Sequence, residues 1–111
     1  MGDTNYFSGI VKVLETPIET SFNDKILVTK FRVEVPQIRK TRIITLVFLG
    51  NLAREVKNYY QMNDYILIEG YLSIRNKKNI NSITNNSKQV TITVLKVYPF
   101  LLKSNHDISK V

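Results

Sequence analysis

Several residue types are scarce or missing in this chain of 111 residues, and each absence excludes a class of site. There is no cysteine, which excludes disulfides and thiolate metal sites. The single histidine, His106, has only Asp107 beside it, and the carboxylates occur singly, so we expect neither a metal site nor a nucleophile–base pair. There is also no glycine-rich phosphate loop. The sequence therefore predicts a protein that is not an enzyme and that needs no cofactor.

Long apolar stretches are missing as well. No apolar run approaches the roughly 18 residues that a membrane span needs, and the opening MGDTNYFSG lacks the apolar segment of a secretory signal. We expect no membrane association and an intracellular location. The length corresponds to one domain, which we place at residues 1–102. The polar residues 103–111 are expected to form a flexible C-terminal tail.

Acidic residues are missing from two segments that carry the whole surplus of positive charge. The net charge is +7, and residues 37–42 and 75–88 together contain seven basic residues and no acid. The basic residues of the two segments are Arg39, Lys40, Arg42, Arg75, Lys77, Lys78 and Lys88. A surplus gathered in this way is typical of a surface that faces a polyanion. The alternative is that basic loops only keep a small domain soluble.

Hydrophobic patterning predicts five strands and one short helix. The expected strands are residues 5–17, 25–35, 42–50, 63–75 and 89–101, and a polar loop is expected at 18–24. The helix is expected at residues 52–60, between the third and fourth strands, with Asn51 as its N-cap. The pattern predicts an all-β protein with one short helix, built as a five-stranded OB-fold barrel.

Side chains on these elements divide into a core and a candidate binding surface. Leu52, Val56 and Tyr59 form the apolar face of the predicted helix. Phe31, Phe48, Tyr59 and Tyr60 are assigned to the core. Gly70 has no side chain, which predicts a tight corner or a close approach of two backbones.

An OB-fold binds oligonucleotides or oligosaccharides on its strand 2–3 face and in two of its loops. The two basic segments fall on the hairpin between strands two and three and on the loop after strand four. Lys30, Arg32 and Arg42 are predicted to contact phosphates from the outward face of strands two and three. Their alternative role is a solvated strand face paired with Glu34. The outward face of strand four is expected to present Tyr71 for stacking or for a subunit contact, together with Ser73 and Arg75.

Four stretches follow one another along nearly the whole of residues 5–101: NYFSGIVKVLETP, LVTKFRVEV, VFLGNLAREVKNYYQMNDYILIEGYLSIR and QVTITVLKVYPFL. The third contains an apolar strand, Gly, Leu-Ala, a helix that ends in an aromatic pair, and a strand with Glu-Gly-x-Leu-x-x-Arg. Together they resemble the bacterial-type single-stranded DNA-binding protein family. The chain looks like a divergent member, comparable to the primosomal B protein or to the related proteins of plastids and mobile elements.

The resemblance implies sequence-tolerant binding of single-stranded DNA by a homo-oligomer, a dimer or a tetramer, in replication, recombination or repair. RNA stays open as a ligand, and replication proteins are expected partners. Self-association is expected along strand one, through Tyr6, Ser8, Ile10 and Lys12. Where the family has base-stacking aromatics, this chain has Ile43, Leu49 and Lys77. We therefore expect charge and apolar contact to replace most of the stacking.

The rival hypothesis is a protein-interaction or assembly adaptor with weak or no DNA binding. It is favoured by the missing aromatics and by the ending DISKV, which lacks the acidic tail through which the family recruits partners. The concentrated positive charge opposes it. The Asn-, Ile- and Lys-rich composition resembles that of AT-rich genomes, which indicates a plastid or a bacterial or phage setting.

Overall fold

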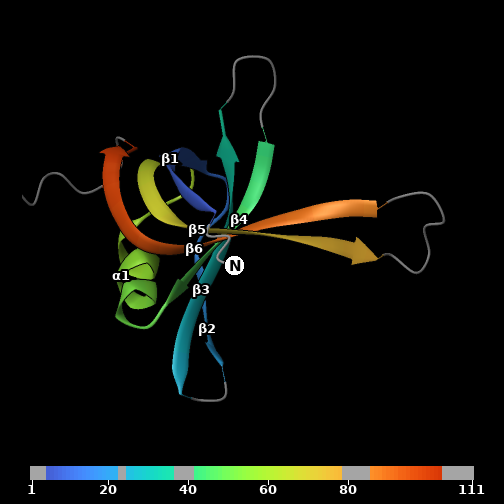
Figure 1. Cartoon of the computed structure of the whole chain (residues 1–111). Coiled ribbons are helices and arrows are strands. Elements are labelled where there is room, and N and C mark those ends of the chain that lie inside the picture. Colours follow the sequence, from blue (N-terminus) through green and yellow to red (C-terminus); the bar gives the residue numbers. More distant parts are fainter. Residues whose placement is uncertain (1–4, 23–24, 37–41, 79–85, 104–111) are drawn as a thin grey trace, which may run out of the picture.

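The chain folds into six strands and one helix in the computed structural model, which describes residues 5–22, 25–36, 42–78 and 86–103. In chain order the elements are β1 (Tyr6–Val13), β2 (Ile18–Phe22), β3 (Ile26–Val35), β4 (Arg42–Leu49), α1 (Asn51–Tyr59), β5 (Tyr65–Lys78) and β6 (Asn86–Leu101). Figure 1 shows α1 against one side of the strands, while the β2–β3, β3–β4 and β5–β6 hairpins point outward in different directions.

Five of the strands close into a barrel, because each of them pairs with a neighbour on both sides. The order around the barrel is β1, β5, β6, β4 and β3, and β3 returns to β1 where Lys12 lies opposite Glu34 and Val13 opposite Val33. Neighbouring strands run antiparallel except β4 and β6, which are parallel. The predicted all-β OB-fold barrel is confirmed.

The remaining strand, β2, departs from the sequence prediction. Residues 18–22 were expected to belong to a polar loop, but they pair with β3 from Ile18 opposite Lys30 to Phe22 opposite Ile26. Their polar side chains do not prevent pairing, because a strand ladder uses backbone groups. The predicted first strand accordingly ends at Val13 and not at residue 17. With β2 inserted, α1 lies between β4 and β5, which are still the third and fourth strands of the barrel.

Alternate side chains of the barrel strands point inward and form the hydrophobic core. Phe31 and Phe48 are fully buried and stack with ring centroids 5.3 Å apart. Tyr60 is also buried, and burial raises the pKa of its hydroxyl to about 12. These three core assignments are confirmed. The assignment of Tyr59 to the core is wrong: this last residue of α1 is 48% exposed, and its ring meets that of Tyr60 edge to face.

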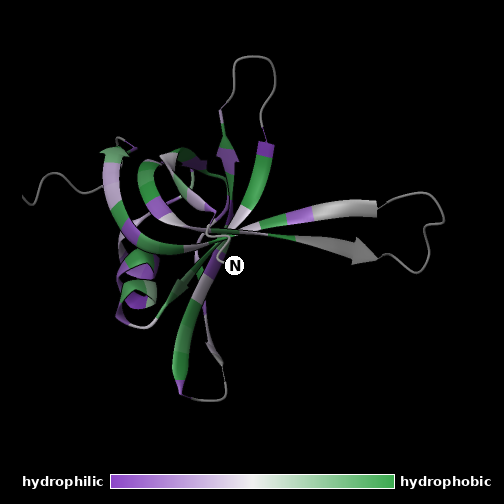
Figure 2. Cartoon of the chain, viewed as in Figure 1, coloured by the Kyte–Doolittle hydropathy of each residue, from purple (hydrophilic) through white to green (hydrophobic). Residues whose placement is uncertain are grey.

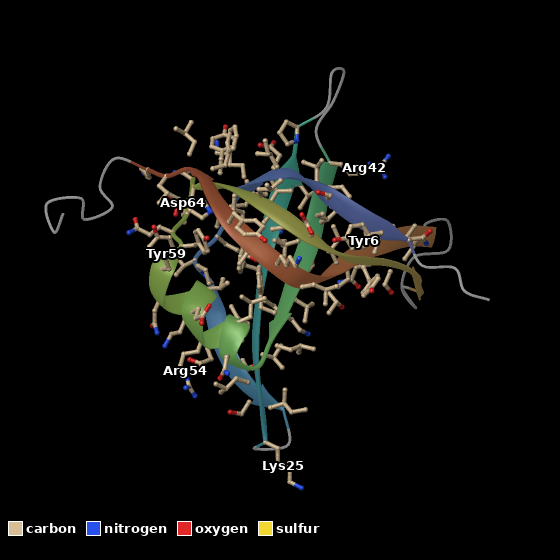
Figure 3. All side chains as sticks on the ribbon, turned by 60° about the vertical axis from the view of Figure 1, so that its left-hand side comes forward. Tyr6, Lys25, Arg42, Arg54, Tyr59 and Asp64 are labelled. Atoms are coloured by element: carbon tan, nitrogen blue, oxygen red, sulfur yellow. The ribbon has the colours of Figure 1, made fainter. Side chains whose placement is uncertain are left out.

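The helix covers one end of the barrel through its small and branched residues. Ala53 and Val56 are buried, and the Thr29 hydroxyl donates a hydrogen bond to the Ala53 carbonyl at 2.8 Å. Arg54 points away from the barrel (Figure 3). The prediction of Asn51 as N-cap is wrong, because the cap is Gly50 and no side chain bonds the helix start. Gly50 has φ 67° and ψ −137°, a conformation that favours glycine.

Asp64 connects the turn after α1 with the chain that follows β6. Its buried carboxylate accepts hydrogen bonds from the backbone N–H groups of Gln61 and Lys103, both at 2.8 Å. Its backbone carbonyl accepts the N–H of Val13, also at 2.8 Å. The start of the predicted tail is therefore bonded to the barrel, whereas residues 104–111 lie outside the described part of the chain.

The β5–β6 hairpin is longer than the sequence predicts. Strand pairing continues past Arg75 opposite Gln89 to Lys78 opposite Asn86, so β5 does not end at residue 75 and β6 does not begin at residue 89. The backbones of Lys77, Lys78 and Lys88, expected in a loop, belong to these strands. Polar residues can continue the ladder there because no core has to be filled behind them. Figure 1 shows this arm leaving the barrel, and Figure 2 shows hydrophobic and hydrophilic residues in turn along the strands of the barrel itself.

Candidate nucleic-acid interface

A groove of about 410 Å³ lies on the outer surface where β3, β4, β5 and β6 run side by side. Its lining is mostly hydroxyl-bearing, with one amide, one cation and one aliphatic side chain. The lining residues are Lys30, Thr45, Val47, Ser73, Gln89, Thr91 and Thr93. Hydroxyls and amides both donate and accept hydrogen bonds, so the floor of the groove offers partners to phosphates, sugars and base edges alike.

Strand register brings these residues together. Thr45 of β4 lies opposite Thr91 of β6, which in turn lies opposite Ser73 of β5. In the neighbouring row Val47 lies between Lys30 of β3 and Thr93 of β6. Since side chains alternate along a strand, the core residues between them point inward and leave these on the outside. Five of the seven, Thr45, Val47, Gln89, Thr91 and Thr93, were missed from sequence, although the alternation in QVTIT (89–93) marks part of this polar face.

The cations predicted for strands two and three take different positions. Lys30 is exposed and lines the groove. Arg32 is exposed as well, but its guanidinium lies 3.4 Å from the carboxylate of Glu15, which also accepts the backbone N–H of Arg32 at 2.8 Å. The alternative partner predicted for this face, Glu34, is therefore not the carboxylate that Arg32 contacts. Lys30 carries its charge into the groove, whereas the charge of Arg32 is partly neutralised.

The other predicted residues of β4 flank the groove. Ile43 is 57% and Leu49 47% exposed on the outer face of this strand. Arg42 is exposed at the start of β4. It lies opposite Val35, which follows the buried Phe31 and Val33 at alternate positions of β3, so Arg42 belongs to the inward side of the strand and not to the side of Lys30. The prediction that it shares one face with Lys30 and Arg32 is therefore wrong in this respect. Figure 3 shows Arg42 at the opposite end of the molecule from Lys25.

The candidates on β5 lie at the edge of the groove and beyond it. Ser73 lines the groove, and Tyr71 precedes it on the same outward face with 43% of its side chain exposed. Arg75, Lys77, Lys78 and Lys88 occupy paired positions on the hairpin arm, and only their backbone is described. Arg39 and Lys40 lie outside the described residues.

The residues predicted for self-association all lie along β1. Tyr6, Ser8, Ile10 and Lys12 alternate with inward residues and pair with β5, from Tyr6 opposite Tyr71 to Lys12 opposite Tyr65. The Tyr6 hydroxyl donates a hydrogen bond of 2.8 Å to the Glu69 carboxylate, which raises the pKa of Tyr6. β1 meets β3 only at Lys12 and Val13, so within the described chain the same edge of β1 has no strand partner from Tyr6 to Val11.

Within the described ranges, no three His, Cys, Asp or Glu side chains come together in a way that could hold a metal ion. The same part of the chain contains no helix with the length and apolar character to cross a membrane.

A curated relative shows which family this barrel belongs to. The protein ycf41 of Trieres chinensis, named as a candidate single-stranded DNA-binding protein, is 36% identical over 104 residues, which cover 90% of this chain and 92% of the relative. The chain belongs to the single-stranded DNA-binding protein family. None of the models of protein families that were compared matches the sequence.

Solved structures of this family share the fold at low sequence identity. The second single-stranded DNA-binding protein of Mycobacterium smegmatis is 24% identical, with a TM-score of 0.67 over 98% of this chain and 94% of that one. The small single-stranded DNA-binding protein of Streptomyces coelicolor is 15% identical, with a TM-score of 0.73 over 99% and 100%. The mitochondrial protein Rim1 of S. cerevisiae is 7% identical, with a TM-score of 0.75 over 92% and 100%. The barrel is thus kept while most side chains differ.

Proposed function

We propose that the chain binds single-stranded DNA, with little regard to sequence, in the groove across β3, β4, β5 and β6. The groove carries this proposal, because it joins a cation and a row of hydroxyls on the outer face of a barrel of this family. In the chain, both segments with surplus charge are next to strands that line the groove: residues 37–42 follow β3 and lead into β4, and residues 75–88 connect the end of β5 with the start of β6.

Binding in this groove depends on charge and hydrogen bonds more than on stacking, because no aromatic side chain is among the residues that line it. Each base stacked on an aromatic ring contributes about 1–3 kcal/mol, and Tyr71 offers such a ring beside the groove. Ile43 and Leu49 supply apolar contact instead. The phosphate contacts come from Lys30, Arg32, Arg39, Lys40, Arg75, Lys77, Lys78 and Lys88. Ser73 adds a hydrogen bond at the floor of the groove.

Fluorescence anisotropy of labelled oligo-dT with the full chain, at several salt concentrations, tests the proposal. If phosphate contacts dominate, log K falls with log salt by roughly 0.7 per neutralised phosphate on single strands. Lys30→Glu is expected to weaken binding at low salt and to reduce this slope. Lys25→Glu makes the same charge change at an exposed position just before β3, away from the groove, and serves as the matched control. Undetectable binding of the unmodified chain at low salt would refute the proposal, and equal losses in both variants would refute the groove as the site.

The same experiment determines whether Lys77 and Lys78 bind DNA or only maintain the structure of the β5–β6 hairpin. Reversing the charge of Lys77 and Lys78 together is expected to weaken oligo-dT binding and to leave the unfolding temperature nearly unchanged. Oligo-rU in place of oligo-dT determines whether RNA is bound as well. Equal losses of binding and of stability would assign these residues to the hairpin structure.

Self-association through β1 is part of the proposal. A strand edge without a partner is a template for pairing with another chain, and two copies of β1 can pair along Tyr6–Val11. Light scattering coupled to size exclusion distinguishes a monomer from a dimer or a tetramer. A monomer at micromolar concentration would contradict this part alone.

The adaptor remains the second candidate, because exposed apolar side chains gather near the end of β6, where Tyr98, Phe100 and Leu101 are each at least 45% exposed. Such a patch is typical of a protein contact, and replication proteins are the expected partners. We further infer a non-enzymatic role in replication, recombination or repair and a plastid setting, which accords with the relative from Trieres chinensis. Detectable binding of oligo-dT by the unmodified chain favours single-stranded DNA binding over the adaptor function.

A further inference from the structure

The edge of β3 that faces away from β4 changes its strand partner near Arg32. On this edge β1 pairs with β3 as far as Val33, and β2 begins to pair at Lys30, so Arg32 lies between the two ladders. The Arg32 carbonyl accepts the N–H of Leu14 at 3.0 Å, and its N–H donates to the Glu15 carboxylate at 2.8 Å. The side chain of Glu15 therefore takes the place of a strand partner at this point.

The same carboxylate also holds the guanidinium of Arg32. Nε of Arg32 lies 3.4 Å from Oε2 of Glu15, and Nη2 lies 3.4 Å from Oε1, so both carboxylate oxygens contact one edge of the guanidinium. The backbone N–H of Arg32 bonds Oε2 independently of this charged contact. The carboxylate thus keeps an anchor of its own when the arginine side chain moves away.

Strand register places Arg32 at the end of a row of groove residues. Arg32 lies opposite Thr45, Thr45 opposite Thr91, and Thr91 opposite Ser73. Residues directly opposite one another in neighbouring strands point to the same face of a sheet. The other three residues of the row line the groove, whereas the guanidinium of Arg32 is turned to the edge of β3 that carries Glu15.

A phosphate in the groove would compete with Glu15 for this guanidinium. Carboxylates and phosphates bind the same fork of arginine N–H donors. The existing contact is open to exchange, because the two side chains are 62% and 38% exposed and an exposed ion pair is weak. Arg32 released from Glu15 would be a second cation on the face where Lys30 lines the groove.

We propose that Glu15 sets the affinity of the chain for single-stranded DNA, because it holds Arg32 outside the groove until a phosphate of the strand displaces it. The inference rests on the proposed function and concerns the regulation of that same site. Glu15 is a positioning residue, since it acts through Arg32. Its ion pair is broken before the phosphate contact is gained, so the chain binds more weakly than it would with an unpaired arginine.

Fluorescence anisotropy of labelled oligo-dT with the full chain tests the role of Glu15. Glu15→Gln removes the charge and keeps an oxygen that can accept the N–H of Arg32. We expect this variant to bind about 3- to 5-fold more tightly at low salt, the upper part of the range for an exposed ion pair, because the contact involves both carboxylate oxygens. The difference should shrink as the salt concentration rises, because salt screens exposed charges.

Two comparisons show whether Glu15 acts through Arg32. Glu55→Gln makes the same charge change at an exposed position of α1, outside the groove, and should alter the affinity by less than about twofold. In a chain that already carries Arg32→Gln, the effect of Glu15→Gln should also stay below about twofold, because no guanidinium is left to release. The same tightening with and without Arg32 would reveal a general charge effect and would overturn the proposal.

The unfolding temperature separates this role from a purely structural one. Glu15→Gln should leave it nearly unchanged, whereas Glu15→Ala removes the acceptor of the Arg32 N–H and should lower it by several degrees. Oligo-dT binding of Glu15→Gln that is equal to or weaker than that of the unmodified chain would overturn the proposal and leave the groove intact. Absence of oligo-dT binding by the unmodified chain would instead refute the proposed function itself.

Discussion

Replacing Gly70 with alanine tests how closely β5 and β6 approach one another beside the groove. Gly70 lies next to Tyr71, at a shift in the β5–β6 register between Glu69 and Gly70. A Cβ atom added there would lie 2.2 Å from the carbonyl oxygen of Thr93 and 2.9 Å from the Cα of Val94. Both are backbone atoms, so no flexible side chain can move aside.

The size of the effect follows from that contact. Ordinary van der Waals contact begins near 3.4 Å, so the two strands would have to separate locally by about 1 Å. Overpacking of this kind costs about 1–3 kcal/mol, and each ladder hydrogen bond that is lost adds about 1 kcal/mol. The lower entropy of the unfolded alanine chain offsets less than about 1 kcal/mol. We expect Gly70→Ala to lower the free energy of unfolding by about 2–4 kcal/mol.

Urea denaturation followed by circular dichroism measures this change, and Gly9→Ala is the matched control. A Cβ at Gly9 would meet the far end of the Phe7 ring at 3.0 Å, which can give way, so its cost should stay below about 1 kcal/mol. Oligo-dT affinity of the folded Gly70→Ala protein should fall as well, because Tyr71 and Thr93 are displaced. If Gly70→Ala is as stable as Gly9→Ala, the close approach of the two strands is refuted.

Two further predictions concern the core and the groove. Burial raises the pKa of Tyr60 to about 12 in the folded protein, whereas the hydroxyl of an unfolded chain loses its proton near pH 10. The free energy of unfolding should therefore be constant below pH 10 and decline between pH 10 and pH 12. At about 1.4 kcal/mol per pKa unit the loss is at most about 3 kcal/mol. Tyr60→Phe should flatten this part of a plot of unfolding free energy against pH, and an unchanged decline would contradict the assignment. Ile43→Trp places a ring at the edge of the groove and is expected to tighten oligo-dT binding by about 5- to 150-fold. Because Ile43 is largely exposed, anisotropy should change while the unfolding temperature does not; unchanged affinity would exclude this position from the binding surface.

Local patterning in the sequence determined most of the fold. The alternation in KILVTKFRVEV predicts β3, with Phe31 and Val33 inside and Lys30 and Arg32 outside, because a two-residue period leaves a half-buried strand few other arrangements. The apolar run ending at Gly50 predicts the strand β4, whose alternate residues Ile44, Leu46 and Phe48 are buried. The close approach at Gly70 followed from its missing side chain. Each of these features depends only on residues close together in the sequence, so the rest of the chain is not needed to predict it.

Tertiary structure decided the features that depend on pairing. The sequence could not reveal β2, because its polar side chains hide a ladder that uses only backbone groups and needs β3 beside it. Nor could it show that the β5–β6 ladder continues to Lys78. Arg32 turned out to contact Glu15, which is 17 residues away in the chain, and not Glu34 on its own strand.

The candidate site also combines features that the sequence predicts with features that only the tertiary structure sets. The charge surplus, a local property, predicted the two basic segments as a surface for a polyanion, and the alternation along strand two predicted the outward position of Lys30. The groove joins residues of four different strands, β3, β4, β5 and β6, and only the register of those strands brings them together. The sequence by itself determined that the outer surface is basic and poor in stacking rings. The closed barrel decided which hydroxyls form the groove floor, because barrel closure sets those distances and chain order does not.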